Sequence, residues 1–128
     1  MSATATDDLS GRIDVIERGY EYLLAYAAQG RQSETGSEAR QTLESMYGAL
    51  DGLAELLATA VGAASKPGGA DTTGFIEAIR DDARKARGAI GLVLSRPAIS
   101  SLLVDNLNAS IHLRALLTDV FLAEQAQN

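Results

Sequence analysis

The chain contains no cysteine, and its 128 residues include one histidine and two prolines. Without thiols it can form no disulfide, no thiolate nucleophile and no zinc site built on cysteine. A single histidine cannot supply a histidine-rich metal site. The scarcity of proline leaves long stretches free to be helical, because proline inside a helix removes a backbone hydrogen bond. We therefore expect no metal, no other cofactor and a chain built mainly from helices.

Long apolar runs and an excess of basic charge are absent as well. No stretch approaches the roughly 18 apolar residues that a membrane span needs. The first residues, MSATATDD, contain neither the basic nor the apolar segment of a secretory signal. The net charge of -6 opposes binding to nucleic-acid phosphates and to anionic membranes. The sequence therefore predicts a cytoplasmic protein that binds neither nucleic acid nor membrane.

Apolar residues recur every three to four positions in four segments, as they do on one face of an amphipathic helix. The segments GRQSETGS and SKPGGAD separate the first three of them, and Pro97 lies in the first turn of the last. The expected helices span residues 7–29, 38–64, 72–95 and 97–124. Because short links favour antiparallel neighbours, the predicted fold is all-α. We expect an antiparallel four-helix bundle over residues 7–128, after a flexible tail of residues 1–6.

The last expected helix carries apolar residues on two sides. A surface helix normally buries one apolar stripe and exposes the rest. On one continuous helical wheel, the first stripe contains Ile99, Leu102, Leu113, Leu117 and Val120, and the second contains Val104, Leu107, Ile111 and Leu122. Leu103 and Phe121 fall between the two stripes. This pattern predicts a helix that packs on its own bundle with one side and on a partner with the other. A homodimer formed through this helix, the first helix or both is the expected assembly.

The first expected helix has a second semi-apolar side, on which Tyr22 and Tyr26 lie together with Val15. Tyrosine is favoured at protein interfaces because it combines an apolar ring with a polar tip. A wide core stripe would produce the same pattern, and the sequence does not separate the two. The candidate interface residues are thus Tyr22, Tyr26, Val104, Leu107, Ile111 and Leu122.

Asn106, Ser110 and Arg114 follow one another at intervals of four residues, which places them in one column between the two apolar stripes. A buried charge without a partner is costly, so such a column needs bonding partners. One interpretation is a structural network in which Arg114 pairs with an acid of an earlier helix. The other is a pocket for a small anionic or polar ligand, with Arg114 as its anchor.

No pattern in the chain assigns a catalytic residue. His112 falls on a polar face with Asp105 and Asn108; it is interpreted as a surface or interface histidine, with a phosphoacceptor as the alternative. No glycine-rich phosphate loop, zinc-protease motif or Ser-His-Asp arrangement stands out. The sequence therefore predicts a non-enzymatic interaction protein, such as an adaptor, an assembly factor or a regulator, acting through apolar helix surfaces. A ligand-binding sensor with its pocket around Asn106, Ser110 and Arg114 is the alternative.

Overall fold

The computed structural model describes residues 3–33, 38–65 and 68–126. The expected all-helical class is confirmed, and this part of the chain contains no strand. Its helices are α1 (Ala3–Ala27), α2 (Glu38–Leu50), α3 (Leu53–Ala64), α4 (Thr73–Leu94), α5 (Ser101–Ala109) and α6 (His112–Ala126). Because α1 begins at Ala3, the backbone of residues 3–6 is helical where a flexible tail was expected.

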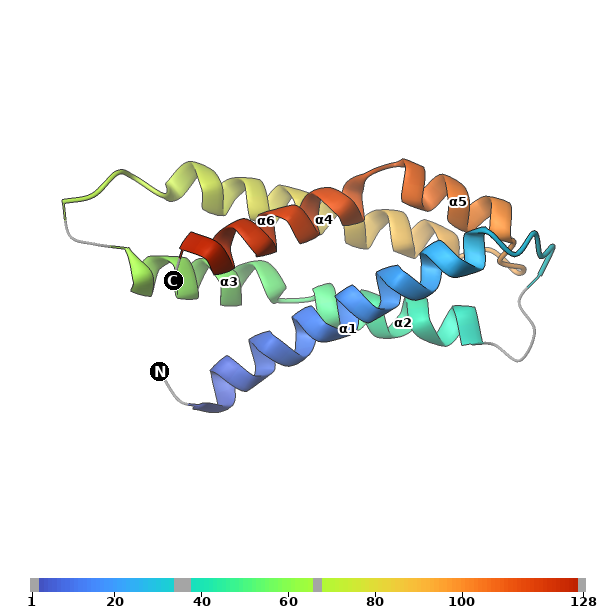
Figure 1. Ribbon diagram of the computed structural model, residues 1–128, viewed down its shortest axis with the longest axis horizontal. Coiled ribbons are helices and arrows are strands. Elements are labelled where there is room, and N and C mark those ends of the chain that lie inside the picture. The colour runs from blue at the N-terminus through green and yellow to red at the C-terminus, as the bar shows by residue number, and fades with distance from the viewer. Residues whose placement is uncertain (1–2, 34–37, 66–67, 127–128) are drawn as a thin grey trace.

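The helices lie side by side in an elongated arrangement (Figure 1). α2 and α3 follow each other along one side, and α4 runs back past both of them. α5 and α6 then return along α4, which contacts α6 more than α5. The last turns of α1 lie against α2 and α5, whereas its first turns lie away from α3 and α6 in Figure 1. The helices therefore pack less closely at the end where α6 finishes.

The expected helix over residues 38–64 is interrupted between α2 and α3. Gly52 has a φ angle of 79°, a left-handed conformation that glycine adopts without steric cost. Arg12 of α1 donates hydrogen bonds to the carbonyl oxygens of Gly48 at 3.4 Å and Ala49 at 3.3 Å, and also to that of Asp51. These are carbonyls of the kind that a helix end leaves without a partner. Arg12 thus stabilises the break from a neighbouring helix.

The expected helix over residues 97–124 is also divided. Ile111 has a φ angle of 64°, which is an outlier for a β-branched residue, and it separates α5 from α6. α5 begins only at Ser101. The residue before it, Ser100, caps the helix, because its hydroxyl accepts a hydrogen bond from the Leu103 amide at 3.0 Å. Pro97 therefore lies in the turn between α4 and α5 and not in the first turn of a helix. α4 and α5 are separate helices, not one rod kinked at Pro97.

This division removes the two-sided helix that the sequence indicated. The buried residues of α5 are Ser101, Val104 and Leu107, and those of α6 are Leu113, Leu116, Leu117, Val120 and Ala123. Each set forms one stripe on its own helix. The left-handed residue Ile111 changes the helical phase between the two stripes, so a single continuous wheel placed them on different sides. Leu102, assigned to the first stripe, is instead exposed.

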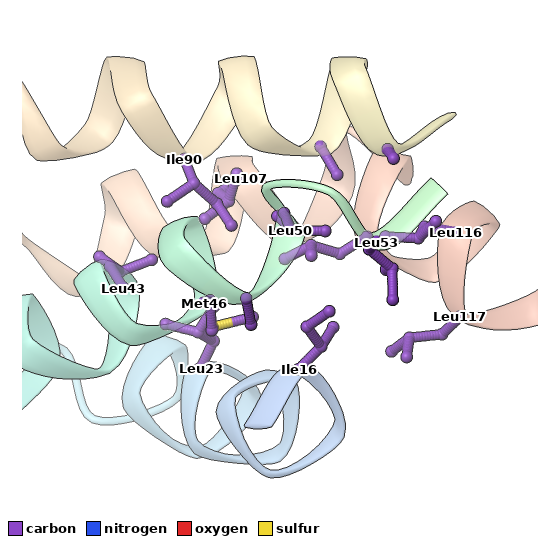
Figure 2. Close-up of a cluster of buried hydrophobic side chains, with 14 of the residues drawn as sticks. Ile16, Leu23, Leu43, Met46, Leu50, Leu53, Ile90, Leu107, Leu116 and Leu117 are labelled. Carbon is purple, nitrogen blue, oxygen red and sulfur yellow. The ribbon is translucent and has the colours of Figure 1, made fainter. Parts of the chain in front are cut away.

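The core lies where the helices converge. Figure 2 shows the labelled side chains of this cluster turned toward a common interior: Ile16, Leu23, Leu43, Met46, Leu50, Leu53, Ile90, Leu107, Leu116 and Leu117. Gly19 lets α1 and α2 approach closely here, because a Cβ at this position would overlap the Sδ and Cγ atoms of Met46. Every helix thus contributes large buried side chains to the core. This includes the helices before and after each break, α2 with α3 and α5 with α6.

Candidate functional site

Three of the predicted interface residues lie inside the chain's own core. Tyr26, Val104 and Leu107 are all buried, and Tyr22 is half-buried, with its ring stacked on that of Tyr26 at a centroid distance of 6.1 Å. The helical wheel drawn as one continuous helix assigned Val104 and Leu107 to an outer face, because it did not include the break at Ile111. These side chains pack the monomer and are not available to a partner.

Ile111 and Leu122, the other two predicted interface residues, are exposed. Their side chains are 58% and 57% accessible. Ile111 directly precedes α6, and Leu122 lies in its last turns, roughly three helical turns further along. Phe121, which the sequence placed between the two stripes, is 47% accessible and lies next to Leu122. The last turns of α6 therefore carry two large apolar side chains at the surface.

The polar column of Asn106, Ser110 and Arg114 does not form one pocket. Asn106 and Arg114 are exposed on α5 and α6, on either side of the helix break. The Ser110 hydroxyl donates to the carbonyl oxygen of Leu107 at 2.6 Å. A shallow hollow of about 290 Å³ does lie beside Arg114, lined also by Ile111, Ala115, Thr118 and Asp119. Only Arg114 of the three contributes to its lining.

Two carboxyl groups meet between α4 and α6. The carboxyl group of Asp82 on α4 acts on that of Asp119 on α6, and Oδ2 of Asp119 is buried without a hydrogen-bond partner in the described part of the chain. Burial, together with the hydrogen bond and the negative charge of Asp82, raises the pKa of Asp119 to about 7. Two facing carboxylates repel, and protonation of Asp119 removes this repulsion. A helical wheel puts Asp119 on the polar face of His112, and nothing in the sequence indicated its pairing with Asp82.

The described residues contain no group of three or more His, Cys, Asp or Glu side chains that could hold a metal ion. Asp82 and Asp119 therefore form a pair without further carboxylate or imidazole ligands around them. The chemistry that this pair offers is the uptake and release of a proton at Asp119, which changes the repulsion between the two carboxyl groups.

An apolar hollow of about 440 Å³ lies beside the last turns of α6. The end of α3, the start of α4 and the end of α6 surround it. Its lining consists of Val61, Ser65, Asp71, Thr72, Phe75, Leu122, Ala123 and Ala126. Leu122, which is more than half exposed, forms part of its edge. An exposed leucine next to an apolar concavity is the pattern of a protein-binding surface.

A second hollow, of about 270 Å³, lies on the side of α6 that faces α1. It is lined by Leu9, Ser10, Ile13, Asp14, Glu17, Leu57, Ala123 and Glu124. Ala123 borders both hollows, and Leu57 lies one helical turn before Val61 on α3. The two hollows therefore flank the same turns of α6.

Carboxylates surround the second hollow. Burial, together with the charges of Glu124, Asp14 and Glu21, raises the pKa of Glu17. Arg18 offsets one of these charges by pairing with Asp14 at 2.9 Å. Glu17 and Glu124 make no ion pair that the structure describes. The side of this hollow toward α1 is therefore negatively charged.

Protein-family models, curated protein sequences and solved structures were each compared with this chain, and none of them matches it. The site must therefore be interpreted from its own geometry. In the part of the chain that the structure describes, no helix has the length and apolar character to span a membrane.

Sequence reasoning missed most of the residues around the two hollows. Leu57 and Val61 fit the core stripe of the expected helix over residues 38–64, and nothing in their spacing showed that they border open space. Leu122 carried a signal, since it belonged to the second apolar stripe. The hollows arise from the separation of α1, α3 and α6, which depends on tertiary packing.

Proposed function

We propose that this protein is a small, non-enzymatic interaction protein of the cytoplasm. It acts as an adaptor, an assembly factor or a regulator by binding another protein through the last turns of α6. The observation that carries this proposal is the exposure of Leu122 at the edge of the apolar hollow of about 440 Å³. Apolar side chains at the edge of a concave apolar surface gain stability when a partner removes them from water.

We further propose that the six helices act as one antiparallel four-helix bundle. In this view α2 with α3, and α5 with α6, are two rods that are each interrupted once. Their sequential placement along the long axis supports this interpretation (Figure 1). A bundle of this kind gives α6 a rigid support, which a docking surface needs in order to bind without a large loss of conformational entropy.

The expected homodimer is a second candidate. Ile111 and Leu122 are both exposed, the first directly before α6 and the second in its last turns. In a symmetric pair each residue contacts the position that contacts it in return. An antiparallel pairing of α6 with its copy would bring Ile111 of each chain to Leu122 of the other. This dimer would use two of the six residues that the sequence indicated.

Photo-crosslinking in the cells that produce the protein tests the proposal. A benzophenone amino acid replaces Leu122 in one variant and Glu44, an exposed residue of α2, in the control. We expect a discrete adduct from position 122 and none from position 44. An adduct of twice 13.4 kDa would identify the homodimer, whereas another mass would identify a different protein. Equal labelling at both positions, or none at position 122, would overturn the proposal.

A further inference from the structure

The apolar hollow that Leu122 borders has the size of a small-molecule site. Its volume of about 440 Å³ lies within the range of roughly 300–1,000 Å³ that is typical of ligand pockets. The end of α3, the start of α4 and the end of α6 enclose it. Figure 1 shows these three helix ends together at the end of the molecule where α6 finishes. A ligand in the hollow would therefore contact protein on more than one side.

Apolar side chains form most of the lining of this hollow. Val61 and Phe75 are half-buried, and Leu122 is more than half exposed. Ala126, at the end of α6, is exposed as well. Each of these side chains keeps apolar surface in contact with water. A ligand with an apolar body is stabilised here, because it removes that surface from water.

Asp71 adds a negative charge to the lining. Its Oδ1 accepts hydrogen bonds from the hydroxyl and the amide of Thr73 at 2.7 and 3.0 Å. These bonds fix the carboxylate and lower its pKa, so it is ionised at neutral pH. Asp71 makes no ion pair that the structure describes, and none of the described residues lining the hollow is Lys, Arg or His. The charge of Asp71 is therefore left for a ligand to balance.

Other occupants fit this combination of an apolar surface and one carboxylate less well. A fatty acid would bring a second carboxylate to Asp71, and like charges oppose association. A second copy of this chain carries a net charge of -6, and the last turns of its α6 contain Glu124 but no Lys or Arg. Opposite charges favour association, so the hollow favours a ligand that joins a positive charge to an apolar body.

We propose that this hollow binds a small organic cation, a primary amine on an aryl or alkyl body. The body lies on Val61, Phe75 and Leu122, and the ammonium group lies beside Asp71. The site goes beyond the proposed function, because it needs no protein partner. Since the ligand covers Leu122, it competes with a protein that docks at the same position.

Three probes that differ in charge but share one apolar body test the inference. They are phenylbutylamine, phenylbutanol and phenylbutanoate, which are positive, neutral and negative at pH 7. Each is titrated into the isotope-labelled full-length protein, and amide chemical shifts are followed by NMR. We expect the shifts to cluster around Val61, Phe75 and Leu122. The amine should bind about threefold more tightly than the alcohol, the size of effect that one exposed ion pair produces, and the carboxylate should bind most weakly.

Two pairs of variants locate the binding site. Asp71→Asn keeps an oxygen for the bonds from Thr73 and removes the charge, so the amine should bind no better than the alcohol. Asp105→Asn, an exposed position on α5, is its control and should leave the preference for the amine unchanged. Ala126→Trp fills the hollow and should abolish binding of all three probes. Ala78→Trp, at an exposed position of α4 outside the lining, should not. Circular dichroism confirms that each variant is folded.

The inference and the proposed function fail in different ways. Equal affinity of the three probes, an unchanged preference in Asp71→Asn, or shifts that lie outside the hollow would overturn the inference. Shifts at the same amides that depend on protein concentration without any probe would assign the hollow to a second copy and would also overturn it. If position 122 still crosslinks to another protein in these cases, the proposed function stands. If the amine binds as expected but position 122 gives no adduct, the inference stands and the proposed function fails.

Discussion

The hydroxyl group of Tyr26 donates a hydrogen bond of 2.6 Å to the backbone carbonyl oxygen of Ile99. This bond joins the last turn of α1 to the turn that precedes α5. Ser101 supports the same junction: its hydroxyl donates to the Tyr26 carbonyl at 2.7 Å and accepts from the Arg31 amide at 2.8 Å. The Ser101 amide in turn donates to the Arg31 carbonyl at 2.8 Å. A buried polar junction therefore fixes the position at which α5 begins.

The variant Tyr26→Phe tests the energetic contribution of this junction. The phenyl ring preserves the packing of Tyr26, while the hydrogen bond to Ile99 is lost. We expect the free energy of unfolding to fall by about 1 kcal/mol, measured by urea denaturation. Tyr22→Phe is the control, because the Tyr22 hydroxyl makes no hydrogen bond that the structure describes. A fall of equal size in both variants would contradict a specific role for the Tyr26 bond.

Ile111 stores backbone strain at the break between α5 and α6. A φ angle of 64° costs a residue with a Cβ about 1–2 kcal/mol relative to its ordinary conformation, and the exposed side chain of Ile111 recovers little by packing. We expect Ile111→Gly to be more stable than Ile111→Ala by about 1 kcal/mol, because alanine keeps the Cβ that creates the strain. Thermal unfolding of the two variants measures the difference. Equal stability would indicate that the helix break is not strained.

The sequence predicted the helical class and, to within one residue, the helix ends at Glu38, Ala64, Thr73 and Leu94. The break at Gly52 had a signal in the pair Asp51-Gly52, which is typical of a turn, but the apolar spacing continued through it. The break at Ile111 had none, since a β-branched residue is among the least suited to a left-handed conformation. Tertiary packing overrode local preference there, and the assignment of Val104 and Leu107 to an outer surface failed with it.

The candidate site was less predictable than the fold. Leu122 was identified because an apolar residue off the core stripe is visible on a helical wheel. The pairing of Asp82 with Asp119 depends on how α4 and α6 are aligned, and no single-helix pattern contains that information. Phe75 and Val61 border the apolar hollow beside α6 for the same reason, because they belong to helices whose separation the sequence does not specify.

A negative charge should have opposite consequences at Leu107 and at Leu122. Leu107 is buried, so Leu107→Asp places a carboxylate in the core and should destabilise the fold by more than about 3 kcal/mol. Leu122 is more than half exposed, so Leu122→Asp should change stability by less than about 1 kcal/mol. Circular dichroism with urea titration distinguishes the two. A folded, stable Leu107→Asp protein would restore the original assignment of that residue to an interface.

The facing carboxyl groups of Asp82 and Asp119 make stability depend on pH. The pKa of Asp119 is raised to about 7 in the folded protein, compared with about 3.9 in an unfolded chain. Between these two values the folded state binds more protons than the unfolded state. The contribution of Asp119 to the free energy of unfolding is therefore greatest below about pH 4. It falls as the pH rises toward 7 and stays low above that value.

Replacing Asp119 with Asn tests this dependence, because the amide cannot ionise and can donate a hydrogen bond to Asp82. Asp119 is partly exposed to solvent, which screens the repulsion and reduces the expected gain at pH 8 to about 1 kcal/mol. Urea denaturation at pH 5 and pH 8 should show a smaller pH dependence for Asp119→Asn than for the wild type. Asp105→Asn, which removes an exposed carboxylate from α5, is the control. If the wild type is equally stable at both values of pH, the two carboxyl groups do not share a proton in the folded protein.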